Sequence, residues 1–182
     1  MRNTIIFTII FGLLIVLFFV FKKGLDVKTE HSEKTEYLKE DTSKNMPLFE
    51  FTTLEGAIFS KYNLTENKAT IIVYFDPDCS LCQKSGTVFS KFKTLHKNSN
   101  VLFVSPSSIK RIKKYQEQFN LETISNITFL QCKEDAFYNT FKELSTPTYL
   151  IYNKNQKIIK IINDDVPVKI ILRYIKAAQI EA

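Results

Sequence analysis

Glycine and proline are scarce in this 182-residue chain, with four and five copies, which excludes a collagen-like or mucin-like chain. Full disorder is excluded as well, because 45% of the residues are hydrophobic and only 24% are charged. Three cysteines are too few to hold a chain of this length together, so any cysteine chemistry must be local. The net charge of +6 is too small for a dedicated nucleic-acid binder. The composition fits one globular domain.

The longest hydrophobic run covers residues 5–21 and carries no charge, with Arg2 before it and Lys22 and Lys23 after it. As a helix it would extend roughly 25 Å, close to the thickness of a bilayer's hydrocarbon core. The run ends in bulky aromatic and branched residues, whereas a signal peptidase site needs small ones. We therefore predict that residues 1–23 are an uncleaved transmembrane signal anchor.

The next segment, residues 24–45, is rich in lysine and in acidic residues and poor in apolar ones. Such a composition buries too little apolar surface to offset the entropy of ordering. We predict a charged linker, in which His31 is solvated and binds no metal. The folded domain should then cover residues 46–182.

Within that domain, short apolar runs alternate with stretches of helical periodicity. The predicted strands are residues 48–52, 57–60, 69–75, 101–104, 127–130, 148–152 and 157–162. The predicted helices are residues 79–96, 109–119, 136–144 and 171–178. After a leading hairpin the order is β-α-β-α-β-α-β-β-α, with parallel crossovers first and an antiparallel hairpin last, so the fold class is α/β with helices on both sheet faces.

Cys79 and Cys82 stand where the buried strand 69–75 leads into the first helix. At a helix start, unpaired backbone N–H groups and the helix dipole stabilise a thiolate, the species that attacks disulfides. The C-x-x-C spacing places the two Cα atoms roughly 5–6 Å apart, within reach of a disulfide. The pattern predicts a redox-active pair.

Two other interpretations of the pair are a structural zinc site and two merely buried thiols. Zinc needs about four ligands, and only Cys132, His31 and His96 remain, in no second paired cluster. We expect Cys132 to be a small, partly buried side chain. We expect His96 to face solvent. We also expect the basic residues in 110–114 to form the solvent-exposed face of the second helix.

Three segments resemble a thioredoxin-like redoxin domain, closest to membrane-anchored TlpA-like thiol–disulfide oxidoreductases of the AhpC/TSA–redoxin superfamily. They are FEFTTLEGAIFSKYNL (49–64), IIVYFDPDCSLC (71–82) and STPTYLI (145–151). The resemblance covers residues 46–182 and implies a thioredoxin fold, a central mixed sheet flanked by helices. It also implies a cis Thr146–Pro147 bond facing the cysteines, with Thr146 and Pro147 contacting the substrate.

The motif departs from the family pattern at Asp78, where an aromatic residue is common, and at Ser80 and Leu81, where Pro or His is frequent. We expect Asp78 to be the N-cap of the first helix. Val73 and Ser85 occupy the positions at which related proteins carry proton-transferring acids.

The leading hypothesis is a membrane-tethered thiol–disulfide oxidoreductase. Cys79 attacks a disulfide of a protein substrate, Cys82 resolves the mixed disulfide, and a membrane electron-transfer partner resets the pair. It requires no metal or cofactor beyond the Cys79–Cys82 disulfide. Either direction of electron flow is open.

Two alternatives share the fold. One is a peroxiredoxin-like thiol peroxidase, although Asp76 stands three residues before Cys79, where that pattern has threonine. The other is a copper-delivery or protein-binding module. Copper chaperones of this fold resemble one another in a C-x-x-x-C pair with a distal histidine, a pattern that the C-x-x-C pair and His96 of this chain do not match.

The flanking charges of the anchor lean slightly toward a cytoplasmic domain. The family resemblance points to the periplasm or cell exterior. We follow the resemblance and expect an extracytoplasmic catalytic domain.

Overall fold

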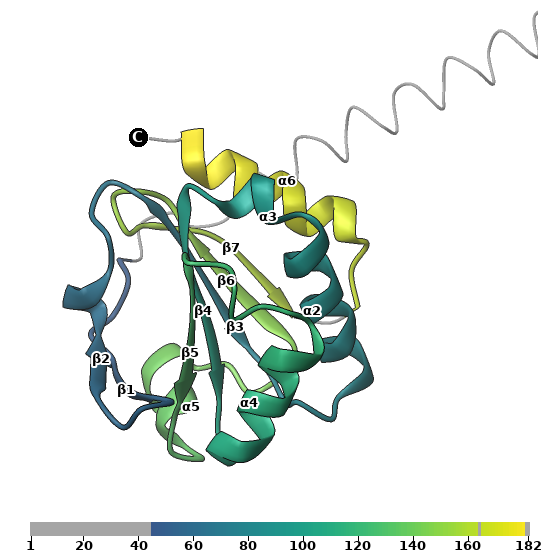
Figure 1. The fold of residues 1–182 in the computed structure, drawn as a ribbon. Helices are drawn as coiled ribbons and strands as arrows, with labels where there is room; N and C mark the ends of the chain where they lie inside the picture. The colour runs from purple at the N-terminus through teal and green to yellow at the C-terminus, as the bar shows by residue number, and fades with distance from the viewer. Residues whose placement is uncertain (1–44, 164, 181–182) are drawn as a thin grey trace, which may run out of the picture. The chain divides into compact units, whose positions relative to one another are not determined.

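The computed structural model describes residues 45–163 and 165–180 (Figure 1). The predicted anchor, and nearly all of the predicted linker, lie outside the described residues. Among the helices that are described, none combines the length and the hydropathy needed to cross a bilayer.

One mixed sheet forms the centre of the domain, with seven strands in the order β2-β1-β5-β4-β3-β6-β7. The strands are β1 (Glu50–Thr53), β2 (Ile58–Ser60), β3 (Ala69–Tyr74), β4 (Ser99–Ser105), β5 (Ile127–Gln131), β6 (Thr148–Tyr152) and β7 (Ile158–Asn163). Strands β3, β4 and β5 run parallel to one another, whereas β6 and β7 are antiparallel, as is the leading β1–β2 hairpin. The mixed α/β architecture and the leading hairpin predicted from the sequence are thus confirmed.

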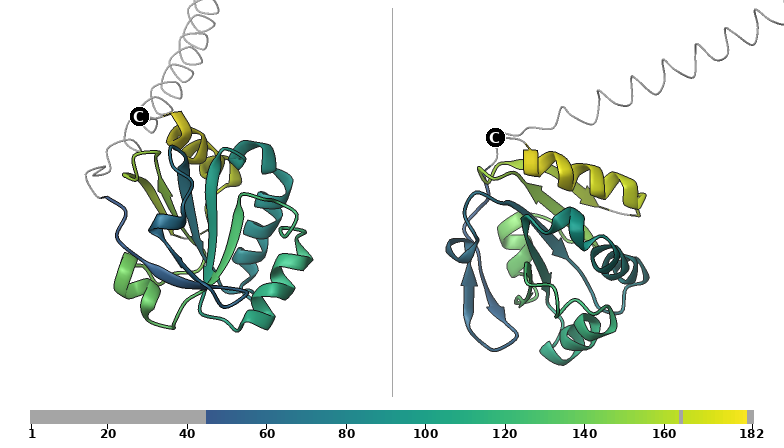
Figure 2. Two further views of the ribbon diagram at one scale, coloured as in Figure 1. Left: turned by 60° about the vertical axis from the view of Figure 1, so that its left-hand side comes forward. Right: turned by 45° about the horizontal axis from the view of Figure 1, so that its top comes forward.

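The helices pack on both faces of this sheet (Figure 2). They are the 3-10 helix η1 (Lys61–Asn63) and the α-helices α2 (Ser80–Lys91), α3 (Lys93–His96), α4 (Ile109–Gln118), α5 (Ala136–Phe141) and α6 (Val168–Ile180). Residues of α2, α4 and α6 share one apolar core, and residues of α5 share the other with the leading hairpin.

Strand β3 contributes side chains to an apolar core on each face of the sheet. All six of its residues are buried, and successive side chains point to opposite faces. Ile71 and Val73 join the core under α2, α4 and α6, whereas Ile72 and Tyr74 join the core under α5. A strand covered on both faces is what its nearly all apolar sequence predicts, and this prediction is confirmed.

The first helix differs from the prediction, because residues 79–96 form two helices. The chain leaves helical geometry at Phe92, with φ −106° and ψ 31°. The expectation that His96 faces solvent is wrong: this side chain is 1% exposed. The break turns His96 inward, where its Nε2 lies 2.9 Å from the carbonyl oxygen of Phe89.

Candidate functional site

The central strand β3 leads at its carboxyl end into α2 (Figure 1). Cys79 and Cys82, the two motif cysteines, lie at the start of α2. A short turn links the two elements: the backbone N–H of Asp78 donates to the Asp76 carboxylate at 2.9 Å, and that of Cys79 to the Asp76 carbonyl at 3.1 Å. Cys79 itself is the N-cap of α2. The expectation that Asp78 caps the helix is therefore wrong, because the turn places the helix start one residue later.

The two thiols differ in exposure although they are three residues apart. Cys79 is half-buried at the helix start, whereas Cys82 lies one turn inside α2 with 0% of its surface exposed. The hydroxyl of Tyr115 donates to the Cys82 carbonyl oxygen at 2.5 Å, which ties this turn of α2 to α4. Neither cysteine is in a disulfide in this structure.

These surroundings separate the acidities of the thiols. Burial opposes ionisation of Cys79, but hydrogen bonds from the Cys82 thiol and from the backbone N–H groups of Cys82 and Leu81 outweigh it, so the pKa of Cys79 lies below its ordinary value. Burial, helped by the same hydrogen bond, raises the pKa of Cys82 to about 12. Cys79 is therefore the thiol that ionises first and that a partner can reach.

The segment predicted to face the cysteines does so. The Thr146–Pro147 peptide bond is cis, as expected, and the Cys79 thiol donates to the Thr146 carbonyl oxygen at 3.6 Å. These residues are 67 positions apart in sequence. They meet because β6 begins at Thr148 and pairs antiparallel with the end of β3 at Tyr74.

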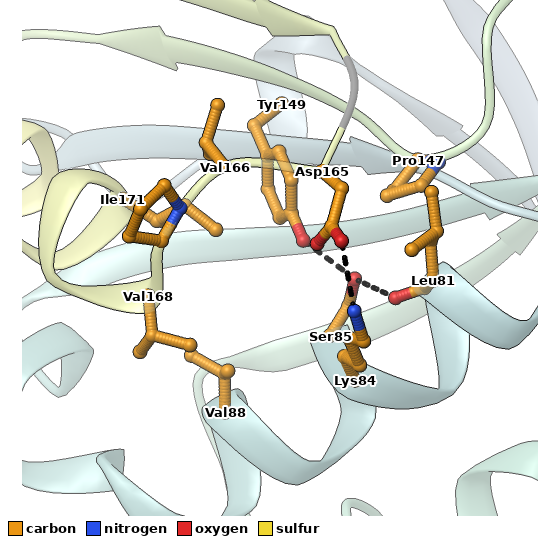
Figure 3. A pocket seen from close by; sticks show the side chains of 11 residues that line it. Leu81, Lys84, Ser85, Val88, Pro147, Tyr149, Asp165, Val166, Val168 and Ile171 are labelled. Carbon is orange, nitrogen blue, oxygen red and sulfur yellow. Dashed lines mark hydrogen bonds and ion pairs between the residues drawn. The ribbon is translucent and has the colours of Figure 1, made fainter.

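A cavity of about 340 Å³ opens beside Leu81 and Pro147 (Figure 3). Its walls come from α2, from the start of β6 and from the segment leading into α6, and they are largely apolar: Leu81, Lys84, Ser85, Val88, Pro147, Tyr149, Asp165, Val166, Pro167, Val168 and Ile171. Two polar contacts interrupt the apolar lining. The buried hydroxyls of Ser85 and Tyr149 are 2.5 Å apart, and Lys84 pairs with Asp165 at 2.9 Å.

The ionic contacts of Arg111 were not predicted from the sequence. Its guanidinium lies 3.0 Å from the Asp76 carboxylate and 2.5 Å from that of Asp78. The other basic side chains in 110–114 are exposed, as predicted. The sequence signal for this contact is the pair of acids before Cys79, Asp76 and Asp78, because a nearby cation stabilises two neighbouring carboxylates.

Cys132 belongs to the other side of the sheet. It is 6% exposed and lies in the core that contains α5, whereas Cys79 and Cys82 contact the core beneath α2. Burial raises the pKa of Cys132 to about 12. Within the described residues there is no group of three or more His, Cys, Asp or Glu side chains placed to hold a metal ion.

The chain matches no family model and no curated protein. Solved structures do match it. A secreted disulfide oxidoreductase of Mycobacterium tuberculosis, homologous to E. coli DsbE, superposes with a TM-score of 0.61 and 16% identity over 79% of this chain and 98% of that one.

Two further structures share the fold. A member of the Sco family of cytochrome c oxidase assembly proteins, described as having a disulfide switch, has a TM-score of 0.59 and 16% identity over 75% of this chain and 94% of its own. A peroxiredoxin-like protein from Aquifex aeolicus has a TM-score of 0.60 and 14% identity over 74% and 85%. The domain therefore has the thioredoxin-like redoxin fold, and at such identities the likeness establishes the fold alone.

Proposed function

We propose that this protein is a membrane-tethered thiol–disulfide oxidoreductase that acts on protein substrates through Cys79 and Cys82. The observation that carries the proposal is the division between the two thiols: Cys79 is reachable with a lowered pKa, and Cys82 is fully buried directly behind it. The fold it shares with disulfide oxidoreductases supports the same reaction class.

The reaction proceeds by two exchanges. The Cys79 thiolate attacks one sulfur of a substrate disulfide, forming a mixed disulfide, while the other substrate sulfur leaves as a thiolate and takes up a proton. Cys82 then loses its proton and attacks the Cys79 sulfur. The Cys79–Cys82 disulfide forms, and the substrate sulfur that was bound to Cys79 is released as a thiolate, which takes up a proton. Two electrons pass to the substrate, and the reverse sequence oxidises a substrate dithiol.

The surroundings of Cys79 supply the substrate contacts. The backbone of Thr146 adjoins the Cys79 sulfur and offers an edge against which an extended substrate segment can lie. Pro147 and Leu81 border the adjoining apolar cavity, which suits an apolar side chain near the substrate cysteine.

Residues 1–23 serve in this proposal as the membrane anchor, with the domain 46–182 outside the cytoplasm. The Cys79–Cys82 disulfide is the only redox group the reaction requires. Because each turnover changes the redox state of the pair, the proposal includes a membrane electron-transfer partner that restores it.

The test is a comparison of three activities of the purified, reduced full-length chain in a mild non-ionic detergent. We expect reduction of the disulfides of insulin, with activity lost in Cys79→Ser and retained in the matched control Cys132→Ser. Consumption of hydrogen peroxide or retention of copper(I) without disulfide exchange would instead support the peroxidase or the copper-delivery alternative.

A further inference from the structure

The segment directly before Cys79 carries two negative charges. Two carboxylates, Asp76 and Asp78, lie in the three residues before the thiol, and Asp78 is directly adjacent to it. Negative charge beside a thiol disfavours the thiolate. The start of the motif therefore contains a feature that opposes the reaction proposed for it.

The structure supplies a counterion from a distant part of the sequence. The Nη2 atom of Arg111 on α4 lies between the two carboxylates, 3.0 Å from Asp76 and 2.5 Å from Asp78. One nitrogen thus joins both acids across sequence separations of 35 and 33 residues. Asp76 is in addition the acceptor that shapes the turn, through the backbone N–H of Asp78.

We infer that Arg111 is a positioning residue for Cys79: its guanidinium holds Asp76 and Asp78 together and offsets their negative charge at the nucleophile. This inference rests on the proposed function, because it matters only if Cys79 reacts as a thiolate. All three side chains are partly exposed, with 44%, 45% and 79% of their side-chain surface accessible for Arg111, Asp76 and Asp78. Solvent therefore screens the effect, and it acts over short range.

The other ionisable groups near Cys79 do not provide this compensation. Cys82 on α2 and Tyr149 on β6 both have pKa values raised to about 12, and burial raises that of Tyr115 on α4, so all three are neutral near pH 7. Lys84 on α2 is engaged by Asp165 at 2.9 Å beside the cavity. Among these groups, Arg111 is the cation in direct contact with the two acids.

The test is the pH dependence of Cys79 alkylation by iodoacetamide in the reduced full-length chain, followed by mass spectrometry of the Cys79 peptide. We expect Arg111→Gln to move the midpoint upward by about half a pH unit, the order of size that one charge several ångströms away produces in a high dielectric. Adding Asp78→Asn to Arg111→Gln should restore the midpoint. Arg111→Lys, which keeps the charge, should shift it less than Arg111→Gln.

The matched control is Lys114→Gln, which removes an exposed positive charge from the same helix and should leave the midpoint unchanged. Equal midpoints for Arg111→Gln and Lys114→Gln, or a double variant that stays shifted, would overturn the inference while wild-type insulin reduction still supports the proposed function. If the wild-type chain reduces no protein disulfide, the proposed function fails first.

Discussion

The properties of each motif cysteine follow from its position relative to the start of α2. Cys79 is the N-cap and lies outside the helix, where it contacts the Thr146 carbonyl and the solvent-facing turn. Cys82 is one turn further on and faces the core, so burial holds its proton. A difference of three residues thus separates a reachable thiol with a lowered pKa from a buried thiol with a raised pKa, because helix geometry turns the second one inward. This difference is the basis on which we propose Cys79 as the attacking thiol and Cys82 as the resolving one.

His96 is a second residue whose surroundings decide its protonation. Its Nε2 contacts the Phe89 carbonyl oxygen at 2.9 Å, so this nitrogen carries the hydrogen, and the side-chain amide of Asn126 lies 3.3 Å from Nδ1. Burial lowers the pKa of His96 below 6.5. A proton on Nδ1 would also face the amide N–H groups of Asn126.

This predicts a histidine contribution to the pH dependence of stability. The folded pKa of His96 lies below the unfolded value, so its contribution is complete above pH 6.5 and is lost as the pH falls through the lower, folded pKa. We expect the free energy of unfolding of the full-length chain in urea to fall between pH 7.5 and 5, and to fall less in His96→Gln. His31→Gln, which removes the chain's other histidine, is the control and should keep the wild-type slope. Identical slopes for wild type and His96→Gln would contradict this assignment.

At the scale of elements, helix α2 is placed by a close approach to the end of α4. A Cβ added at Gly86 would lie 2.4 Å from one ring carbon of Phe119 and 2.6 Å from another. The Phe119 ring packs in turn against Tyr115, with the ring centroids 4.8 Å apart. Glycine at this position therefore lets α2, which begins with the cysteine pair, sit directly on the aromatic cluster.

We predict that Gly86→Ala destabilises the domain even though alanine is the better helix former. The gain in helix propensity, about 1 kcal/mol, is outweighed by displacing a ring that has packed neighbours, so the net loss should be about 1–2 kcal/mol. Urea unfolding of Gly86→Ala against Thr87→Ala measures this, because Thr87 is exposed on the same turn. A Gly86→Ala variant as stable as wild type would show that Phe119 moves aside freely.

The elements also show what the sequence could predict. Strand β3 was predictable because six consecutive residues are apolar or β-branched, and α4 because Ile112 and Tyr115 recur at helical spacing. The end of α2 at Phe92 was not predictable from the sequence, because apolar residues continue at helical spacing through the break.

In the candidate site, too, the features with a local sequence pattern were predictable and the long-range contacts were not. The cysteine pair is a local motif, and Pro147 was predicted through the resemblance of segment 145–151 to the thioredoxin-like family. His96 contacts Asn126, 30 residues later, and Arg111 contacts Asp76 across 35 residues. The two acids before Cys79 indicate that a cation lies nearby, but no local pattern identifies Arg111 as that cation or Asn126 as the partner of His96.

At the scale of the whole molecule, the sheet separates the cysteines into two environments. Cys79 and Cys82 adjoin the core under α2, α4 and α6, and Cys132 lies in the core on the other face. Oxidation of the pair can therefore proceed in the folded domain without involving Cys132. The same arrangement makes Cys132→Ser a suitable background for experiments on the pair.

The proposed topology predicts which compartment contains this domain. Protease added to intact spheroplasts, or to whole cells if there is no outer membrane, should degrade residues 46–182 while a cytosolic control protein stays intact. The physical reason is that an uncleaved anchor with its amino terminus inside leaves the following domain outside. Complete protection until the membrane is permeabilised would place the domain in the cytoplasm.

The most direct measurement of the central claim is trapping of mixed disulfides in cells, in the Cys132→Ser background. Cys82→Ser leaves Cys79 able to attack but removes the thiol that resolves the product, so partner proteins should accumulate on Cys79 as bands that disappear on reduction. Cys79→Ser should trap none, because the remaining thiol is buried and its pKa is raised to about 12. Trapping by Cys79→Ser, or no trapping by Cys82→Ser, would contradict the assignment of Cys79 as the attacking thiol and Cys82 as the resolving one.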